Sequence, residues 1–314
     1  MKTLIICGNP CLQNLYYSPF DISCVESSEV KRSQEFHQFL GGKGFNVAGF
    51  LSHQGVNNSV LFPLGKGMSA DFIEQGIKKL SYSCFLNTPM KTDNRVCTTT
   101  IHGGIVQEWI SPNPQISNDE FQCFVDLMLG EIPAYDRVIV CGSIPSMHET
   151  IFLEMQTALL KWKDKGGELW LDQFQNPSHW IQKINGNKIW PSLWKLNLEE
   201  WICLNNILLE QLSQDDSNYS AMIKITTAGD KDTVKIQGGQ FQCGAEIELE
   251  INKLAAVNPI GAGDIWFGAL IEKLDLSPLH DIQLPQMTNA VLYANEVAKS
   301  KVKTLNLWDF ESYL

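Results

Sequence analysis

The sequence predicts an α/β fold in which helices flank both faces of a doubly wound, mostly parallel sheet. Short apolar runs alternate with longer segments of helical period, which is typical of a buried parallel sheet. At 314 residues the chain can bury roughly 75% of its unfolded surface, enough for one large domain. Strands are predicted at residues 4–7, 59–62, 137–140, 168–172 and 222–226.

Two predicted helices begin directly after glycine clusters. The first spans residues 44–54 and stops at Gly55, a common signal for the end of a helix. The second follows Asp264 and runs through residues 266–271. Two β-rich segments, residues 96–110 and 233–251, each turn at a pair of glycines and predict hairpins.

Composition excludes several classes of protein. A formal net charge of -11 disfavours a nucleic-acid partner, because such partners are held through their phosphates. The nine cysteines are scattered without a Cys-x-x-Cys pair, which indicates reduced thiols and a cytoplasmic protein. The first apolar run is too short for a secretory core, and no stretch approaches the ~20 apolar residues of a membrane span. We therefore expect neither a nucleic acid nor a membrane as partner.

The second glycine cluster is suited to phosphate chemistry. Gly261, Ala262 and Gly263 carry little side-chain bulk at a helix start, so their N–H groups can approach phosphate oxygens closely. Asp264 follows where a hydroxyl could lose its proton, which makes it the candidate general base. The alternative is a tight glycine turn followed by an acid that the helix dipole favours.

The first glycine cluster offers contacts for a small polar ligand. Gly41 and Gly42 allow close approach of the backbone, Lys43 supplies a cation, and the Asn46 amide can both donate and accept hydrogen bonds. The segment matches neither the P-loop nor the dinucleotide fingerprint. Without a ligand it would be a flexible loop ahead of a helix, with Lys43 in solvent.

Together, and in this order, the two clusters resemble the signatures of the PfkB (ribokinase-like) family of carbohydrate kinases. The form Gly-Gly-Lys-Gly-x-Asn-Val-Ala is similar to the branch that phosphorylates phosphorylated hexoses, such as 1-phosphofructokinase and tagatose-6-phosphate kinase. The resemblance implies a single ribokinase-like domain over residues 1–314, with a small β-sheet lid inserted near 12–39 and 86–113. It also implies ATP and Mg²⁺ as cofactors, Asp264 as base, and residues 261–263 as the anion hole.

The resemblance also implies a site for the sugar. Arg95 lies in a segment similar to the strand that grips the substrate phosphate, a role that suits the forked guanidinium. Glu108 resembles an acid across the lid hairpin, and Gly142 a glycine at the end of a strand. Arg95 and Glu108 could instead be charges on a solvent face, and Gly142 an ordinary turn. The implied substrate-binding residues are Gln13, Gly41, Gly42, Lys43, Asn46, Arg95, Glu108 and Gly142.

The nucleotide site is implied by two further segments. Residues 195–200 resemble Lys-Pro-Asn-x-x-Glu, in which the Asn197 and Glu200 positions would organise Mg²⁺ through water. A helix cap with acids in its first turn would give the same pattern. Residues 227–229 match a Thr-x-Gly loop that touches the phosphates of ATP. The implied nucleotide-binding residues are Lys195, Asn197, Thr227, Gly229 and Asn289.

Three departures from the family pattern leave questions open. Gln13 replaces an aspartate that bonds sugar hydroxyls, and Asp232 replaces a glycine of the nucleotide loop. Asn258 and Pro259 replace the Asp-Thr/Ser pair ahead of the anion hole, and the proline removes an N–H. A monovalent-cation site, which accompanies that acid in some relatives, is therefore in question.

Lys43 and Arg95 together favour an acceptor that already carries a phosphate, so the leading hypothesis is ATP-dependent phosphorylation of a ketohexose phosphate. A kinase of a neutral sugar or nucleoside is the first alternative, and there Arg95 would be dispensable. The second is a non-catalytic homologue that binds sugar or nucleotide. Relatives often dimerise through the lid, and a lid face exposing Trp109 and Ile110 would support such a homodimer.

Overall fold

The computed structural model describes residues 1–19, 32–80, 83–145, 149–184, 187–211, 222–227, 233–238, 247–250, 257–275 and 277–306. Its strands are β1 (Thr3–Cys7), β2 (Cys11–Ser18), β3 (Glu35–Gly41), β4 (Asn58–Leu64), β5 (Ser83–Pro89), β6 (Arg95–His102), β7 (Ile105–Ile110), β8 (Arg137–Cys141), β9 (Glu168–Asp172), β10 (Gln182–Ile184), β11 (Asn187–Ile189), β12 (Leu193–Asn197), β13 (Ile223–Thr227), β14 (Thr233–Gln237) and β15 (Ile247–Glu250). Its longer helices are α1 (Lys43–His53), α2 (Met68–Ile77), α3 (Asn118–Glu131), α4 (Glu149–Asp164), α5 (Leu198–Gln211), α6 (Ala262–Leu274) and α7 (Leu284–Lys301).

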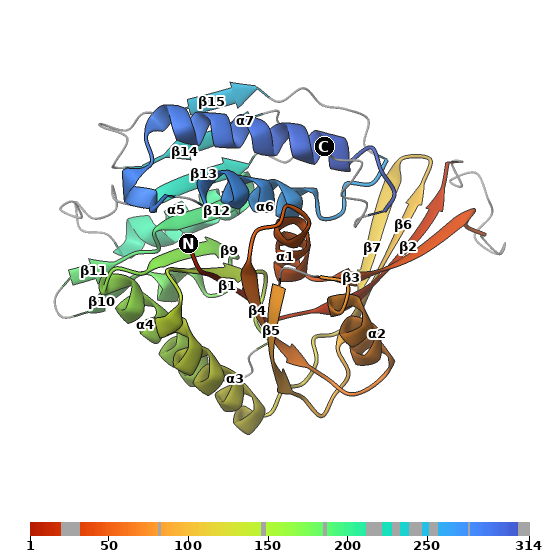
Figure 1. Cartoon of the computed structure of the whole chain (residues 1–314), viewed down its shortest axis with the longest axis horizontal. Coiled ribbons are helices and arrows are strands. Elements are labelled where there is room, and N and C mark those ends of the chain that lie inside the picture. Colours follow the sequence, from red (N-terminus) through yellow and green to blue (C-terminus); the bar gives the residue numbers. More distant parts are fainter. Residues whose placement is uncertain are drawn as a thin grey trace.

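A nine-stranded sheet forms the centre of the molecule, in the order β15-β14-β13-β12-β9-β8-β1-β4-β5 (Figure 1). The strands from β13 to β5 in this order are parallel to their neighbours, whereas β14 and β15 pair antiparallel at one edge. The predicted α/β class and all five predicted strands are confirmed, as β1, β4, β8, β9 and β13. The predicted strands did not include β5 or β12. Strand β5 is a half-exposed edge strand, and Lys195 interrupts the run of apolar residues in β12.

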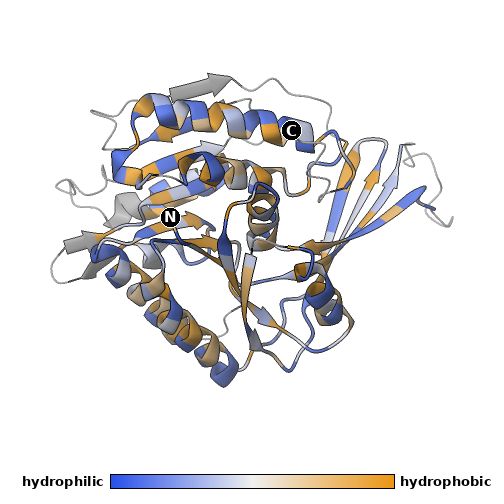
Figure 2. Cartoon of the chain, viewed as in Figure 1, coloured by the Kyte–Doolittle hydropathy of each residue, from blue (hydrophilic) through white to orange (hydrophobic). Residues whose placement is uncertain are grey.

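The core lies in two layers because side chains alternate between the faces of each strand. From β1, Ile5 and Cys7 join the layer beneath α1, α6 and α7. Leu4 and Ile6 join the layer that α3, α4 and α5 cover. Figure 2 shows the central strands as mostly hydrophobic and the helices as striped, which fits helices packed on a sheet by one side.

The helices that follow the glycine clusters confirm their sequence predictions. Helix α1 ends before Gly55, whose φ of 72° is left-handed and terminates the helix. Helix α6 starts at Gly261, whose φ is 69°. None of the helices in the described part of the chain combines the length and apolar character of a membrane span.

A separate four-stranded sheet, in the order β3-β2-β6-β7, projects from the main body (Figure 1). The predicted hairpin at 96–110 is β6 and β7, joined at Gly103 and Gly104, which both have positive φ. Residues 86–89 of the predicted lid segment lie instead in β5 of the large sheet. The predicted hairpin at 233–251 is β14 and β15, and its turn at residue 239 lies outside the described residues.

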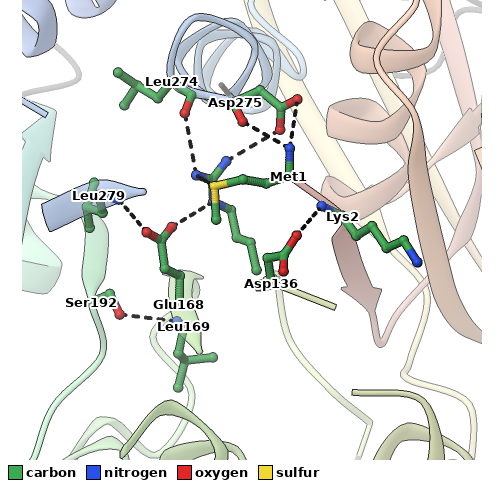
Figure 3. Close-up of polar contacts among 10 residues, drawn as sticks. Met1, Lys2, Asp136, Glu168, Leu169, Ser192, Leu274, Asp275 and Leu279 are labelled. Atoms are coloured by element: carbon green, nitrogen blue, oxygen red, sulfur yellow. Dashed lines mark hydrogen bonds and ion pairs between the residues drawn. The ribbon is translucent and has the colours of Figure 1, made fainter. Parts of the chain in front are cut away.

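A buried charge cluster closes the amino-terminal edge of the large sheet. Glu168, whose contact with Leu279 is drawn in Figure 3, accepts a hydrogen bond of 3.0 Å from Nε of Arg137, the fully buried first residue of β8. Its guanidinium lies 3.7 Å from Asp275 and stacks on Trp170 at 4.1 Å from the ring centroid. Glu168 also accepts from the backbone N–H of Leu279, between α6 and α7. These paired charges hold the α6–α7 connection on the edge opposite the carboxyl ends of the strands.

Candidate active site

The sequence-predicted residues gather at the carboxyl edge of the sheet. The carboxyl ends of parallel strands meet at one edge, which is where open α/β sheets bind ligands. Asp172 ends β9, Asn197 ends β12 and Thr227 ends β13, with Asn197 and Thr227 paired in register. The amino termini of α1 and α6 deliver the two glycine clusters to these strand ends.

The helices α1 and α6 place Asn46 against the candidate base. Asn46 donates from Nδ2 to Oδ2 of Asp264 at 2.7 Å, and both side chains are buried. The close approach of the helices depends on Gly268, where a Cβ would lie 3.1 Å from the Phe50 ring. One oxygen of Asp264 is thereby oriented by an amide, while the buried Asn46 Oδ1 has no partner among the described residues.

The electrostatics of Asp264 are tuned by burial and by two lysines. Burial raises the pKa of the Asp264 carboxyl above its ordinary value of 3.8, although the charges of Lys43 and Lys195 act in the opposite direction. The nearby carboxylate of Asp172 adds to the rise. Asp264 is therefore a stronger proton acceptor than an exposed aspartate.

Asp172 holds two cations in the site. Its Oδ1 lies 3.1 Å from Lys43 Nζ, and its Oδ2 lies 3.1 Å from Lys195 Nζ. Burial alone would raise the pKa of Asp172, but Lys195 and Lys43 outweigh it and lower the pKa. Asp172 in turn is the main cause of the raised pKa of Lys43, so this lysine stays protonated.

The start of α6 can bind an anion. Among the described residues no side chain caps this helix, so its first N–H groups carry the positive end of the helix dipole. A Cβ on Gly263 would lie 3.8 Å from Lys195 Nζ, which places this ammonium beside the first turn. Ala262 N–H already donates to the Pro259 carbonyl at 3.2 Å, so Gly261 and Gly263 are the remaining candidate donors.

Packing requires glycine in the first cluster, apart from any contact of these glycines with a ligand. Gly42 has a φ of 109°, and a Cβ there would lie 3.1 Å from the Asn9 carbonyl. A Cβ on Gly41 would lie 2.8 Å from the sulfur of Cys11. Gly142, with a φ of 72°, donates its N–H to the Asp172 carbonyl at 2.9 Å. The backbone therefore needs glycine here to bring Lys43 beside Asp172.

A polar network joins the lid to the main body. Arg95 donates to Asn113 Oδ1 at 3.3 Å, and Asn9 donates to the same oxygen at 2.9 Å and to Ser143 Oγ at 3.1 Å. Three buried atoms in this region have no partner among the described residues: Arg95 Nε, Asn9 Oδ1 and Asn46 Oδ1. Buried polar groups are normally satisfied, so this set of one donor and two acceptors fits a ligand that carries both hydroxyl groups and phosphate oxygens.

The inner face of the lid carries two more predicted residues. Buried Gln13 donates to Thr99 Oγ1 at 3.0 Å, and Thr99 pairs in register with Glu108. Glu108 is exposed, and the register puts it on the same face of the lid as Thr99. On this face Ile101 joins Ile260, the residue before Gly261, in a small apolar cluster.

Asn197 and Glu200 form a reciprocal helix cap. Glu200 N–H donates to Asn197 Oδ1 at 2.8 Å, and Asn197 N–H donates to Glu200 Oε2 at 2.9 Å. In the described part of the chain no three His, Cys, Asp or Glu side chains form a metal-binding group. The contacts therefore show the helix-cap alternative, and magnesium binding by this pair stays a prediction. Glu200 also contributes to the raised pKa of Lys43, so it acts electrostatically on the site.

Not every predicted nucleotide residue joins this arrangement. Asn289 lies on the exposed side of α7. Gly229 and Asp232 lie outside the described residues.

Sequence reasoning missed Asp172, Asn9 and Asn113 as site residues. Asp172 was signalled by its position, because it is a carboxylate that directly follows the apolar run LWL at the end of strand β9. Asn9 and Asn113 lie 104 positions apart in the chain, and their contact has no local signature.

Comparison with known proteins assigns the chain to a family. The profile of the pfkB family of carbohydrate kinases matches residues 15–307. Phosphofructokinase-2 from Escherichia coli in complex with substrates and products has a similar fold, with a TM-score of 0.73, 16% identity, and 100% and 98% of the two chains covered. The same enzyme in complex with potassium has a TM-score of 0.74 and 15% identity, with 99% of this chain and 96% of that chain covered. Ribokinase from Thermotoga maritima has a TM-score of 0.68 and 17% identity, with 100% of this chain and 97% of that chain covered.

Replacement of Asp172 tests its function as the shared counter-ion. We expect Asp172→Asn to lower the free energy of unfolding at pH 7 by about 3 kcal/mol, because the buried ammonium of Lys195 loses its partner. The pKa of Asp172 is lowered by folding, so its contribution is present above the unfolded pKa and lost as pH falls through the folded one. The difference between the two proteins should therefore shrink below about pH 4.

Urea unfolding over a pH series measures this difference. Asp126→Asn, which changes an exposed carboxylate on α3, is the matched control and should shift stability by less than about 0.5 kcal/mol. Equal stability of Asp172→Asn and the unaltered protein at pH 7 would contradict the assignment.

Proposed function

The chain belongs to the pfkB family of carbohydrate kinases, and on that premise we propose that it transfers the γ-phosphoryl group of ATP to a hydroxyl of a ketohexose phosphate. The observation that carries the proposal is the geometry around Asp264. A buried carboxylate of raised pKa stands at the start of an uncapped helix, within the field of two lysines. Phosphoryl transfer needs a base, an anion site and cations at one place, and this edge of the sheet supplies all three.

In the proposed reaction Asp264 accepts the proton of the acceptor hydroxyl as its oxygen attacks the phosphorus. The bond from Asn46 fixes one carboxylate oxygen, so the other can face the hydroxyl. General-base help of this kind is worth about 10²–10⁴ in rate. The N–H groups of Gly261 and Gly263, together with the Lys195 ammonium, stabilise charge on the transferred group.

The proposed acceptor carries a phosphate because two cations lie at the sugar side of the site. Arg95 has an unpartnered buried Nε, and Lys43 stays protonated beside Asp172. A guanidinium can pair with two phosphate oxygens at once. Gln13, Glu108, Gly41, Gly42, Asn46 and Gly142 are the proposed contacts to the rest of the sugar.

ATP is proposed to lie over the ends of β12 and β13. Lys195, Asn197 and Thr227 lie on these neighbouring strands. Of the other two proposed contacts, Gly229 lies outside the described residues and Asn289 lies on the exposed side of α7, so both stay predictions. Asn197 and Glu200 would hold Mg²⁺ through water, and the ion would supply positive charge to the phosphates.

The cysteines of the described residues are free thiols, which supports a cytoplasmic location.

Replacement of Asp264 tests the proposed base. Asp264→Asn should lower kcat by about 10²–10⁴ with ATP affinity nearly unchanged. Activity of the unaltered enzyme should be lost as pH falls through the pKa of Asp264, with a midpoint above the ordinary value of 3.8. The measurement is acceptor-dependent ADP release from magnesium-ATP with fructose 1-phosphate, fructose 6-phosphate, tagatose 6-phosphate, ribose and nucleosides.

Asp281→Asn, at an exposed aspartate, is the control for this experiment and should leave turnover unchanged. An Asp264→Asn protein with full turnover would refute the assignment of the base. ATP binding without turnover of any acceptor by the unaltered protein would favour the non-catalytic alternative.

Replacement of Arg95 tests the class of acceptor. Arg95→Gln should raise KM for the sugar phosphate about 10- to 100-fold, because one charge-assisted contact worth about 1.5–3 kcal/mol is lost. The KM for ATP should stay the same, as should both constants in Lys91→Gln, which alters an exposed cation nearby. Unchanged kinetics in Arg95→Gln would point to the neutral-sugar or nucleoside alternative.

The lid is proposed to form a homodimer through its outer face. Phe36, Ile105 and Trp109 are 48%, 52% and 54% exposed, and strand register places them on the face opposite the buried Ile101. Ile110, which the sequence grouped with Trp109, lies on the inner face. A row of exposed apolar side chains is typical of an interface.

Sedimentation should therefore detect a dimer that Trp109→Glu converts to monomer. Leu292→Glu, at an exposed leucine of α7, is the matched control and should leave the dimer intact. A monomeric unaltered protein at micromolar concentration would contradict the proposal.

A further inference from the structure

We infer that the ammonium of Lys301 is a built-in cation that positions the loop ahead of the anion hole. Lys301 ends α7 and is fully buried, and its Nζ donates to the carbonyl oxygen of Asn258 at 2.7 Å. This inference rests on the proposed function, because it assigns a positioning residue to that reaction. Lys301 contacts the loop, and its effect on the reacting atoms passes through Gly261 and Gly263.

A fully buried lysine without a carboxylate partner is uncommon and costly. No ion pair within the described part of the chain includes Lys301. Burial lowers its pKa to about 7, and the attraction of Asp264 acts in the opposite direction, so the side chain is an ammonium below that pH and loses its charge above it. The cost of burying the charge is offset by the hydrogen bond to the Asn258 carbonyl and by the longer-range attraction of Asp264.

The end of α7 and the residues after it form further hydrogen bonds with the loop at residues 257–260. The N–H groups of Val257 and Asn258 both donate to the carbonyl of Val302, at 2.7 and 3.0 Å. The Asn258 side chain donates to the Leu305 carbonyl at 2.8 Å and accepts from Ile260 N–H at 3.0 Å. The backbone that leads into Gly261 is thus tied down on both sides of Pro259.

The sequence of the loop creates an acceptor that a buried cation can bind. The peptide bond between Asn258 and Pro259 has a carbonyl acceptor but no N–H, because proline lacks one. Asn258 is fully buried, so this carbonyl needs a partner from the protein interior. The Lys301 ammonium satisfies it and brings a positive charge to the side of the loop that leads to the first turn of α6. Asn258 and Pro259, which replace the Asp-Thr/Ser pair of the family pattern, therefore lie beside the buried positive charge of Lys301.

The test removes the charge at nearly constant volume. Lys301→Met should lower kcat about 10- to 100-fold, as expected when anion-hole donors are misplaced, while KM for ATP changes little. Lys299→Met, which breaks an exposed pair with Glu296 on the same helix, should leave kcat unchanged. A Lys301→Met protein that is less stable but has unchanged kcat would overturn the inference, because the lysine would then be structural.

A second variant separates charge from packing. Lys301→Ala leaves a cavity, and added ammonium or methylammonium should restore turnover, whereas tetramethylammonium at equal ionic strength should not. The unaltered enzyme should be indifferent to all three. No restoration by the small cations would overturn the inference, and this experiment decides the matter if Lys301→Met does not fold.

Hydrogen exchange separates this inference from the proposed function. The amides of residues 257–265 should exchange about tenfold faster in Lys301→Met than in the unaltered protein, because the loop is released. Equal exchange would overturn the inference whether or not any sugar is turned over. Faster exchange in a protein that phosphorylates none of the acceptors would support Lys301 and contradict the proposed function alone.

Discussion

The shared contact of Asp172 with Lys43 and Lys195 is the constraint on which the site depends. One buried carboxylate fixes a cation at the start of α1 and another on β12, each at 3.1 Å. Without it two like charges would face each other in a buried site that also contains Asp264. With it, the positive charge lies beside the helix start where phosphate is proposed to bind, and the charges of both lysines oppose the burial that raises the pKa of Asp264.

Buried charges have different functions at the two edges of the sheet, structural at the amino edge and proposed ligand binding at the carboxyl edge. At the amino edge, Arg137 pairs with Glu168 and Asp275 and stacks on the ring of Trp170, so this cluster holds neighbouring elements of the fold together. At the carboxyl edge several polar atoms keep unused hydrogen-bonding capacity, among them Asn46 Oδ1 and Arg95 Nε. Buried polar atoms of this kind, at the edge where open α/β sheets bind ligands, are available to a bound molecule.

The lid and the anion-hole loop are mechanically connected. Ile260 packs with Leu15, Phe39 and Ile101 of the lid, and the same loop is tied to the end of α7. A change in the lid can therefore reach the first turn of α6 through a single residue. The same inner face of the lid carries Gln13, which is a proposed sugar contact.

The fold class, five strands of the large sheet and the two helix starts could be predicted from the sequence, whereas β5 and β12 could not. Alternating apolar runs and glycine clusters are local signals, and local signals can be read along one chain. The sequence also identified Asn46 and Asp264 as candidates, since both lie in glycine-rich segments. Only the tertiary structure decided that these two side chains touch, that Asp172 joins Lys43 to Lys195, and that Lys301 reaches Asn258. Those contacts bridge 218, 129 and 43 positions of the chain, and burial gives them their energy, so no local pattern could encode them.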